Sequence, residues 1–448
     1  MSALPPNGPF ALRARLLSPL ADGGVLDERD GVVEVDDAGR IARIAAWSED
    51  AGTTAAVIDL RPMVLLPGLV DLHVHLPQIP NAGLGSGLDL LTWLDRYIFP
   101  LETAYDGAVA ARQAPAAFRA FAAAGTTTVV AYAALWEDST DAAFAAAEAH
   151  GIRAVIGKVM MDRLTYDAEI DPNEILETSL RQSDELAARW HGRDEGRLRY
   201  AFTPRFAVSC SADMLRESAV LAQRHGAYWQ THLSEDAGEI DEVRRLFPEA
   251  RDYLDVYDRA GALGARTILA HAIHLSVGEV HRLAESGSNV AHCPASNLFL
   301  SSGLMPLAAY RDAGIAVGLG SDVAAGPEVS MFTVMRAAAV TQRVLELAGR
   351  ADRTDAMHGV DWLRLGTLDG ARVLGMDADI GSIEVGKEAD LIAVDPRLTT
   401  PLPDDEPPLD SADDVMSRLI FRPHPNMVRA AWVRGRPLAG PPGLDTIG

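Results

Sequence analysis

The sequence predicts an α/β fold, a (β/α)8 TIM barrel joined to a small β-sandwich domain that is built from both ends of the chain. Two observations favour this fold. Between residues 67 and 380, eight short apolar segments alternate with Ala-, Leu- and charge-rich helical segments. Short alternating β segments flank that region on both sides. A doubly wound open sheet is the alternative, but no Gly-x-Gly-x-x-Gly turn opens the strand–helix region.

Both ends of the chain carry short alternating segments broken by Gly, Asp and Pro, which is typical of small antiparallel sheets. The N-terminal segments are Ala11–Leu17, Gly31–Val35, Ile41–Ala45 and Ala56–Leu60, and the C-terminal ones lie in Gly381–Val394 and Met427–Val433. The Pro- and Asp-rich stretch Asp395–Asp413 is predicted to be a loop. We therefore expect residues 1–66 and 381–448 to form the small domain, and residues 67–380 to form the barrel.

The central region supplies eight strands and the helices between them. The predicted strands are Leu69–His75, Thr127–Tyr132, Ala154–Val159, Leu198–Thr203, Ala227–His232, Thr267–His271, Asn289–His292 and Ala316–Gly320. The predicted helices include Ala108–Ala124, Asp141–His150, Asn173–His191, Ala212–His225, Val277–Ser286 and Ser330–Leu347. Eight such units over roughly 300 residues fit a closed barrel, whose core is typically about 250 residues long.

The composition narrows the class of protein. The 448 residues include 40 basic and 63 acidic ones, which gives a net charge of -23 and a pI near 4.9. A surface this acidic repels nucleic acid and anionic membranes, and we expect neither of them as a partner. We expect a small-molecule substrate instead. The two cysteines make no disulfide framework. Because the N-terminus lacks the layout of a signal peptide and no apolar run approaches the ~20 residues of a membrane span, a cytoplasmic location is expected.

Polar side chains follow the ends of several predicted strands, which in a barrel meet at the C-terminal face. His73 and His75 end the first strand and point the same way, because alternate residues of a strand share a face. With His232 and Asp322 they make four candidate ligands for one divalent metal, preferably zinc, although iron accepts the same ligands. Unrelated histidines at a strand end would explain His73 and His75 alone, but groups from five strands converge here.

Two further groups at this face suit catalysis. Glu235 follows His232 by three residues and can stand beside a metal-bound water as a proton shuttle. Without His232 upstream, an exposed residue in the first turn of a helix would be the better interpretation of Glu235. His271 could be a further ligand or could steady the charge that develops on the oxygen of the attacked carbon, and we favour the second role. Lys158 could be a modified lysine that bridges two metals, but an ion-pairing residue at the edge of the core is favoured.

Several longer motifs lie along the barrel region. They are Pro67–His75 with Gln78, Asp89–Leu94, Tyr97–Pro100 with Glu102, Gly125–Thr128, Gly157–Asp162, Thr203–Phe206, Gln230–Glu235, His292–Pro294 and Gly320–Val323. From about Val64 to Val394 the chain resembles the metal-dependent amidohydrolase superfamily, and within it the guanine deaminase family. The His-x-His, Thr-His-Leu-Ser-Glu and Ser-Asp motifs are generic to the deaminase branch, whereas Gln78, the Trp-Leu/Tyr-x-Phe-Pro motif and the Pro-Arg-Phe motif are more specific.

This resemblance implies zinc-dependent hydrolysis of guanine to xanthine and ammonia by a homodimeric enzyme. It implies that zinc-bound hydroxide attacks C2 while Asp322 accepts the proton of the water and Glu235 protonates a ring nitrogen. The implied metal ligands are His73, His75, His232 and Asp322, the implied catalytic residues are Glu235, His271 and Asp322, and the implied substrate contacts are Gln78, Trp93, Arg205 and Phe206. Arg205 and Gln78 would offer donors to the base edge, and the two aromatic rings would offer faces for packing.

Several alternatives remain open. A structural ion pair explains Arg205 equally well if the motif is ignored. Two loops depart from the family pattern, namely Tyr132–Asp138, where the family usually carries a histidine, and Val323–Glu328, which is less glycine-rich than expected. Pterins, other aminopurines and triazines are therefore alternative substrates. A second alternative is hydrolysis of a cyclic or acyl amide, which would not need the aromatic rings of Trp93 and Phe206. A third is a barrel that binds small molecules without catalysis, which would not need a complete set of metal ligands or a shuttle carboxylate.

Overall fold

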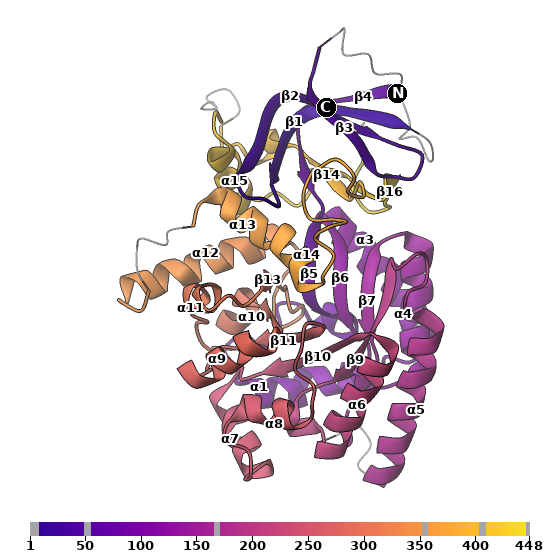
Figure 1. Cartoon of the computed structure of the whole chain (residues 1–448), viewed down its shortest axis with the longest axis vertical. Helices are drawn as coiled ribbons and strands as arrows, with labels where there is room; N and C mark the ends of the chain where they lie inside the picture. The colour runs from indigo at the N-terminus through magenta and orange to yellow at the C-terminus, as the bar shows by residue number, and fades with distance from the viewer. Residues whose placement is uncertain (1–8, 49–54, 165–170, 352–356, 403–408, 445–448) are drawn as a thin grey trace.

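The computed structural model describes residues 9–48, 55–164, 171–351, 357–402 and 409–444. Figure 1 shows a ring of strands surrounded by helices, with a smaller sheet beside it that contains the first and the last strand of the chain, β1 (Phe10–Pro19) and β16 (Arg436–Pro437). This arrangement confirms the predicted barrel with an additional β domain built from both chain ends. The division at residues 66/67 and 380/381 stays a prediction.

Parallel strands form the barrel, in the order β13-β12-β11-β10-β9-β7-β6-β5, with the short β8 paired to β9. The ring is completed where Asp322 N donates to His73 O at 2.7 Å and His75 N donates to Val323 O at 3.1 Å. The strands are β5 (Leu69–His75), β6 (Thr126–Tyr132), β7 (Arg153–Gly157), β8 (Val159–Met160), β9 (Leu198–Pro204), β10 (Tyr228–Leu233), β11 (Thr267–His271), β12 (Asn289–His292) and β13 (Val317–Leu319).

The predicted strands agree closely with these bounds, because barrel strands are buried on both faces and appear in the sequence as apolar runs. One difference lies at Lys158, which interrupts the predicted strand Ala154–Val159 and separates β7 from β8. The Lys158 side chain is buried, and its Nζ donates to Ser179 Oγ at 3.0 Å. Burial lowers the pKa of Lys158 to about 7. A buried ammonium needs polar partners, and this one finds a hydroxyl outside the cluster of histidines described below.

Helices surround the ring (Figure 1). Six of them match predicted helices, namely α3 (Gly107–Ala123), α4 (Glu137–His150), α5 (Pro172–Trp190), α6 (Ala212–His225), α9 (Val277–Ser286) and α12 (Met331–Leu347). The unpredicted helices have ten residues or fewer, too short for a clear periodicity. They are η1 (Leu76–Asn81), α1 (Leu90–Trp93), η2 (Leu94–Ile98), α2 (Phe99–Thr103), η3 (Ala207–Ser209), α7 (Ala237–Leu246), α8 (Tyr253–Arg259), α10 (Pro294–Phe299), α11 (Leu307–Asp312), α13 (Gly359–Leu365), α14 (Leu368–Val373), η5 (Pro396–Thr399) and α15 (Ala412–Phe421).

The small domain contains one seven-stranded sheet with the order β16-β15-β14-β4-β1-β2-β3. Its other strands are β2 (Val25–Val35), β3 (Ile41–Ala46), β4 (Ala56–Pro67), β14 (Leu391–Val394) and β15 (Val428–Val433). N- and C-terminal segments meet where β4 pairs with β14. Of the predicted β stretch Gly381–Val394, only β14 is a strand. The predicted loop Asp395–Asp413 contains η5 and the start of α15, and its residues 403–408 lie outside the described residues.

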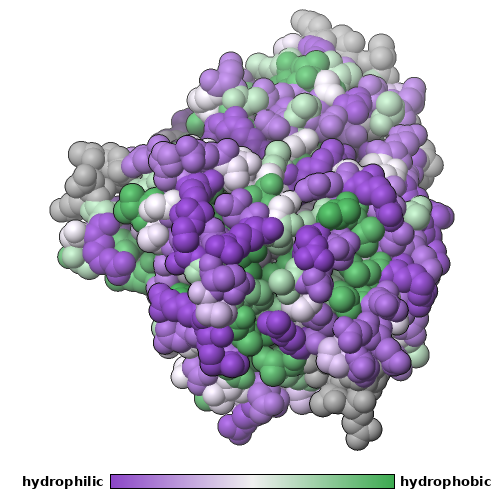
Figure 2. Space-filling view, turned by 60° about the horizontal axis from the view of Figure 1, so that its bottom comes forward, coloured by the Kyte–Doolittle hydropathy of each residue, from purple (hydrophilic) through white to green (hydrophobic). Residues whose placement is uncertain are grey.

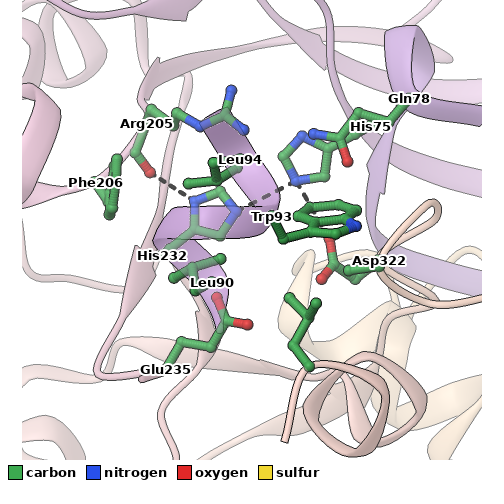
Figure 3. A pocket seen from close by; sticks show the side chains of 12 residues that line it. His75, Gln78, Leu90, Trp93, Leu94, Arg205, Phe206, His232, Glu235 and Asp322 are labelled. Atoms are coloured by element: carbon green, nitrogen blue, oxygen red, sulfur yellow. Dashed lines mark hydrogen bonds and ion pairs between the residues drawn. The ribbon is translucent and has the colours of Figure 1, made fainter. Parts of the chain in front are cut away.

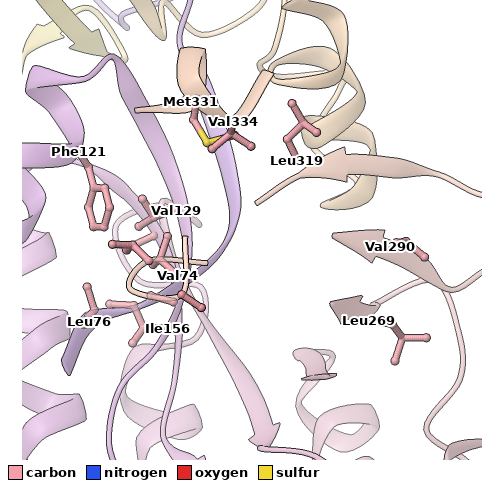
Figure 4. Packing of buried hydrophobic residues seen from close by; sticks show 14 of the residues in the cluster. Val74, Leu76, Phe121, Val129, Ile156, Leu269, Val290, Leu319, Met331 and Val334 are labelled. Atoms are coloured by element: carbon pink, nitrogen blue, oxygen red, sulfur yellow. The ribbon is translucent and has the colours of Figure 1, made fainter. Parts of the chain in front are cut away.

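Buried apolar side chains form two layers in the barrel. The outer layer lies between strands and helices and includes Val74, Phe121, Val129, Ile156 and Met331 (Figure 4). The inner layer joins the first residues of several strands to α14 and the segment after it, and includes Val70, Val155, Tyr228, Ile268, Val373 and Met376. Since Tyr228 begins β10 and its Oη donates to Leu374 O at 2.6 Å, α14 covers the N-terminal end of the barrel. The C-terminal end is left for polar groups.

A buried ion-pair cluster, the Arg153 cluster, joins the barrel to the small domain. It consists of Arg153 at the start of β7, Glu388 and Asp390 before β14, and Arg434 after β15. Arg153 donates to Glu388 and, at 3.1 Å, to Asp390, while Arg434 Nε donates to Glu388 at 2.9 Å. Burial opposes the charge of Arg153, but the Asp390 and Glu388 carboxylates raise its pKa. Each charge in this cluster therefore faces an opposite charge.

Hydrophilic residues cover most of the face shown in Figure 2, and hydrophobic side chains gather in patches between them. Along the described part of the chain, no helix combines the length and the apolar character that crossing a bilayer would require.

Candidate active site

Three histidine rings and one carboxylate meet at the C-terminal end of the barrel, and Figure 3 shows two of these rings, His75 and His232, with Asp322. His75 Nε2 lies 3.2 Å from His73 Nε2 and 3.3 Å from His232 Nε2. Asp322 Oδ1 lies 3.3 Å from Nε2 of both His73 and His75. All four side chains are buried. The structure thus brings the four predicted ligands together.

Hydrogen bonds fix which ring nitrogens face this cluster. His232 Nδ1 lies 2.6 Å from the carbonyl oxygen of Arg205, which can only accept, so Nδ1 carries the proton and Nε2 presents a lone pair. In the same way His271 Nδ1 donates to Asn297 Oδ1 at 2.9 Å. Among the described residues His271 Nε2 has no hydrogen-bond partner, although it is buried. Lone pairs directed at one place in this way are typical of metal-binding histidines.

The spacing of the donor atoms also fits a metal ion. A tetrahedral zinc ion with ligands about 2.0–2.1 Å away separates those ligands by about 3.3 Å, which is the separation found here. His271 is close enough for either of the two roles predicted for it. Its donor atom and those of His73, His232 and Asp322 all lie within 4.8 Å of one another.

Asp71, below the ligands, ties the first strand to the last. Its Oδ1 accepts hydrogen bonds from Ser321 N at 2.8 Å and His73 N at 3.3 Å. Burial raises the pKa of Asp71 to about 6. The next residue after Ser321, Asp322, has φ +50°, in the left-handed region that residues other than glycine rarely adopt. This backbone conformation, held by the Asp71 and His73 contacts, aims the Asp322 carboxylate at the histidines.

Glu235 lies beside the cluster, between β10 and α7. Its Oε2 is 3.5 Å from His271 Nε2, and its Oε1 accepts from Ser302 Oγ at 3.2 Å. The side chain is buried, which rules out the alternative of an exposed helix-start residue. Burial, together with the nearby Asp322 and Glu239 carboxylates, raises the pKa of Glu235 well above its usual value. A carboxyl group with a raised pKa suits a proton shuttle, because the group can both hold and release a proton.

The histidines and Asp322 are in the protonation states that bind a metal. Burial lowers the pKa of His75 to about 3, lowers the pKa of His73, and holds the pKa of His232 well below its usual value. Burial would raise the pKa of Asp322, but His73 and the hydrogen bonds from His73 and His75 hold it well below its usual value. Neutral imidazoles and an ionised carboxylate are the forms that coordinate metals.

A pocket adjoins the cluster, with about 350 Å³ of space that protein atoms do not fill, part of it open to solvent. Every predicted substrate contact lines it, as do three of the four predicted ligands, while His73 and His271 lie behind this lining. The lining residues are His75, Gln78, Leu90, Trp93, Leu94, Arg205, Phe206, His232, Glu235, Leu300, Asp322 and Ala325.

The α1–η2 turn supplies the apolar wall of the pocket. Leu90, Trp93 and Leu94 share one helix face, because residues three and four apart are neighbours on a helix. Asp89 caps this turn by accepting from Thr92 N at 3.0 Å. Trp93 Nε1 donates to a backbone carbonyl at 3.0 Å, which fixes the indole. Phe206 lies on the opposite side of the pocket from Trp93 in Figure 3.

Gln78 and Arg205 form the polar wall, and Glu102 of α2 connects them. The fully buried Glu102 carboxylate accepts from Gln78 Nε2 at 2.8 Å and from Arg205 Nη1. Both interpretations of Arg205 therefore apply, since it forms an ion pair and also lines the pocket. Glu102 takes one of the two N–H donors of the Gln78 amide, so the predicted contact between Gln78 and a base stays a prediction.

Sequence reasoning gave no role to five residues around the site: Asp71, Glu102, Tyr132, Asn297 and Ser302. A signal existed for Asp71, since an acid inside an apolar strand must be paired when buried. The ring of Tyr132 packs against three ligand rings, with centroids 4.6, 4.9 and 5.0 Å away. Asn297 and Ser302 carry no such signal, because their partners lie 26 and 67 positions away in the sequence.

Comparison with known proteins establishes the class. A sequence model of the Amidohydrolase family matches residues 64–438, and the chain belongs to this family. Together with the histidine and aspartate cluster, the family and its members identify a metal-dependent hydrolase.

Individual relatives narrow this class. The probable guanine deaminase of Deinococcus radiodurans is 37% identical over 414 residues, which span 91% of this chain and 92% of the relative. The structure of guanine deaminase from C. acetobutylicum with guanine in its active site gives a TM-score of 0.88 at 28% identity, over 96% of this chain and 100% of the other. An adenosine deaminase from Xanthomonas campestris with bound zinc gives 0.83 at 30% identity, over 99% and 96%. These similarities confirm the resemblance to guanine deaminases that the motifs indicated.

Proposed function

We propose that this chain hydrolyses guanine to xanthine and ammonia. The observation that carries the proposal is a single pocket with two different walls. One wall contains the metal-ligand cluster and a buried shuttle carboxylate, Glu235. The other contains hydrogen-bonding groups from Gln78 and Arg205, with the rings of Trp93 and Phe206 to either side. The relatives named guanine deaminase support this choice of substrate.

The reaction adds water at C2 of guanine and removes the amino group as ammonia. When held by the three histidines and Asp322, a divalent metal supplies an activated water at neutral pH, because zinc lowers the pKa of a bound water to about 7. Zinc as that metal, with iron as the alternative, is part of the proposal, as are a homodimer and a cytoplasmic location.

Protons move through two carboxyl groups. Asp322 accepts the proton of the attacking water, through a carboxylate that is ionised at neutral pH. Glu235, whose pKa is raised by burial, donates a proton to a ring nitrogen beside C2. His271 Nε2 lies between the two carboxyl groups, 3.5 Å from Glu235 Oε2 and 3.8 Å from Asp322 Oδ2. Because Nδ1 donates to Asn297, His271 would steady the negative charge that develops on the oxygen of the attacked carbon as an imidazolium, with a second proton on Nε2.

The base is oriented by the other wall. Trp93 and Phe206 pack against the faces of a flat ring, and Arg205 donates to an oxygen on its edge. Figure 3 places Gln78 and Glu235 on opposite sides of the pocket. A purine whose N3 faces Glu235 therefore turns its N1 towards Gln78, which brings C2 to the metal cluster.

The test is ammonia release by the metal-loaded protein from guanine, with xanthine identified as the product. Adenine, adenosine, a pterin, cytosine and an amino-triazine are measured in parallel under the same conditions. We expect kcat/KM for guanine to exceed that for each of the others. Faster release from another ring would reject guanine as the substrate, and release of ammonia from none of them would reject the proposed deaminase activity.

A further inference from the structure

Glu102 lies behind the polar wall of the pocket and is not itself one of the lining residues. Its carboxylate is fully buried, and it joins Gln78, in η1 after β5, to Arg205, which directly follows β9. One oxygen accepts from Gln78 Nε2 at 2.8 Å and the other accepts from Arg205 Nη1. One buried charge thus determines the arrangement of both polar groups in the substrate wall.

The contact with Glu102 fixes the direction of the Gln78 amide. An ionised carboxylate can only accept hydrogen bonds, so the NH2 end of the amide must face Glu102. No described residue donates to Gln78 Oε1, and Figure 3 shows this oxygen turned towards the indole of Trp93. One N–H of Nε2 is thus held by Glu102, and the acceptor Oε1 of Gln78 is the end of the amide that is turned towards the pocket.

The same carboxylate holds Arg205 in place and balances its charge. The guanidinium also lies 5.6 Å from the ring of Phe99, so it is held from two sides. A guanidinium has five N–H donors, and the ones that do not face Glu102 are left for a ligand. The substrate wall therefore presents a fixed acceptor from Gln78 next to fixed donors from Arg205.

We propose that Glu102 is a positioning residue that makes the pocket select the lactam edge of an oxopurine, N1–H beside C6=O. This inference rests on the proposed function and adds the source of its selectivity. Gln78 Oε1 accepts from N1–H while Arg205 donates to O6. Adenine presents the reverse pattern at this edge, an acceptor at N1 and a donor at the 6-amino group, so it leaves buried polar groups unpaired.

Ligand binding tests this selectivity without turnover. In a Glu235→Gln background, calorimetry gives the Kd of hypoxanthine, which has the lactam edge but no 2-amino group, and the Kd of adenine. We expect hypoxanthine to bind at least about tenfold more tightly than adenine, because the site pairs with its polar groups. Adding Glu102→Gln should reduce this preference to within about threefold, since an amide at position 102 accepts either orientation of Gln78.

Kinetics give a second readout. With Glu102→Gln alone, kcat/KM for guanine should fall by about 10- to 100-fold, mainly through KM, while the metal content stays unchanged. Gln78→Met leaves the Glu102–Arg205 ion pair intact and should lose the same preference. In the Gln78→Met background, Glu102→Gln should cause a smaller further loss than in the wild type, because only its contact with Arg205 remains to be lost. Asp95→Asn, an exposed acid of η2 in the same segment, is the control and should change nothing.

The outcomes separate this inference from the proposed function. Wild-type protein without guanine turnover rejects the proposed function, and the hypoxanthine-to-adenine ratio still decides the role of Glu102. Guanine turnover combined with an unchanged ratio in Glu102→Gln rejects the role of Glu102 alone. If melting shows that Glu102→Gln does not fold, Gln78→Met decides, and an unchanged ratio in that variant overturns the inference.

Discussion

Two buried polar clusters occupy opposite ends of the barrel, and they differ in the charges of the groups that face one another. In the Arg153 cluster at the N-terminal ends of the strands, cations face carboxylates. In the cluster at the C-terminal ends, ring nitrogens of three histidines face one another and a carboxylate at 3.2–3.3 Å. The first cluster pairs its charges within the chain, whereas the second has the donor atoms of a metal site.

This difference teaches how to distinguish a structural cluster from a functional one. Burial alone does not distinguish the two kinds of cluster, because both clusters are buried. The charges of the groups that face one another do distinguish them, since a buried charge is tolerated when it is paired and unfavourable when it is not. Changes in the Arg153 cluster should therefore affect stability, and changes in the histidine cluster should affect metal content and turnover.

The largest effect is expected from His232→Ala. Loss of this ligand should lower the bound metal, measured by atomic emission, to well below one ion per chain. Turnover of guanine should fall by about 10⁴-fold, because a metal contributes several kcal/mol to the stabilisation of a transition state. His225→Ala is the control, since His225 pairs with Asp184 outside the site and should keep both metal and activity. Unchanged metal stoichiometry in His232→Ala would remove His232 from the ligand set.

Glu235→Gln should separate catalysis from metal binding within the same cluster. The amide keeps the size of the side chain but cannot carry a proton to the substrate. We expect kcat to fall by about 10²- to 10⁴-fold with unchanged metal content. Glu242→Gln, on the outer part of α7, serves as the control and should retain full activity. Activity within a few-fold of wild type would reject the shuttle role.

Arg153→Met tests the cluster at the N-terminal end of the barrel. It leaves Glu388 and Asp390 buried with less compensation, so the free energy of unfolding should fall by about 3 kcal/mol, as measured by urea denaturation. Metal content and kcat of the folded protein should not change. Arg181→Met removes an exposed ion pair with Glu185 and should cost less than about 0.5 kcal/mol. Equal losses in the two variants would show that the Arg153 cluster is not structural.

The smallest expected effect is a change with pH in the stability that the Arg153 cluster contributes. Burial opposes ionisation of Glu388, but Arg153 and Arg434 hold its pKa below its usual value. A carboxyl group with a lowered pKa stabilises the folded state above its unfolded pKa of about 4.3, and this contribution is lost as the pH falls further. The difference in unfolding free energy between wild type and Arg153→Met should therefore narrow below about pH 4.3. A difference that is constant from pH 7 to pH 3.5 would contradict this assignment.

Much of the fold follows from the sequence because a barrel strand is buried on both faces and leaves an uninterrupted apolar run. β5, β11 and β12 have the predicted bounds for this reason. The candidate ligands could be predicted for a related reason, since the C-terminal ends of all these strands meet at one face. His73, His75, His232 and Asp322 all follow this rule.

The remaining features depend on contacts that the sequence does not contain. Lys158 interrupts a predicted strand, and its buried amino group donates to a hydroxyl 21 positions away. The orientation of Gln78 depends on Glu102, 24 positions away, and the tautomer of His271 depends on Asn297. A pattern of apolar residues specifies which segments are buried, but not which polar groups meet once they are.

The hydrogen bond between Asp71 and Ser321 joins positions that are 250 residues apart. During synthesis on a ribosome, the first two histidines emerge early, the third follows, and the last carboxylate appears only when the whole ring of strands has been made. A chain that stops short of Asp322 therefore never gathers the full set of ligands. A metal ion can therefore bind all four ligands only after translation and folding of the whole barrel are complete. An ion bound there would link the first strand of the barrel to the last and close a loop of about 250 residues.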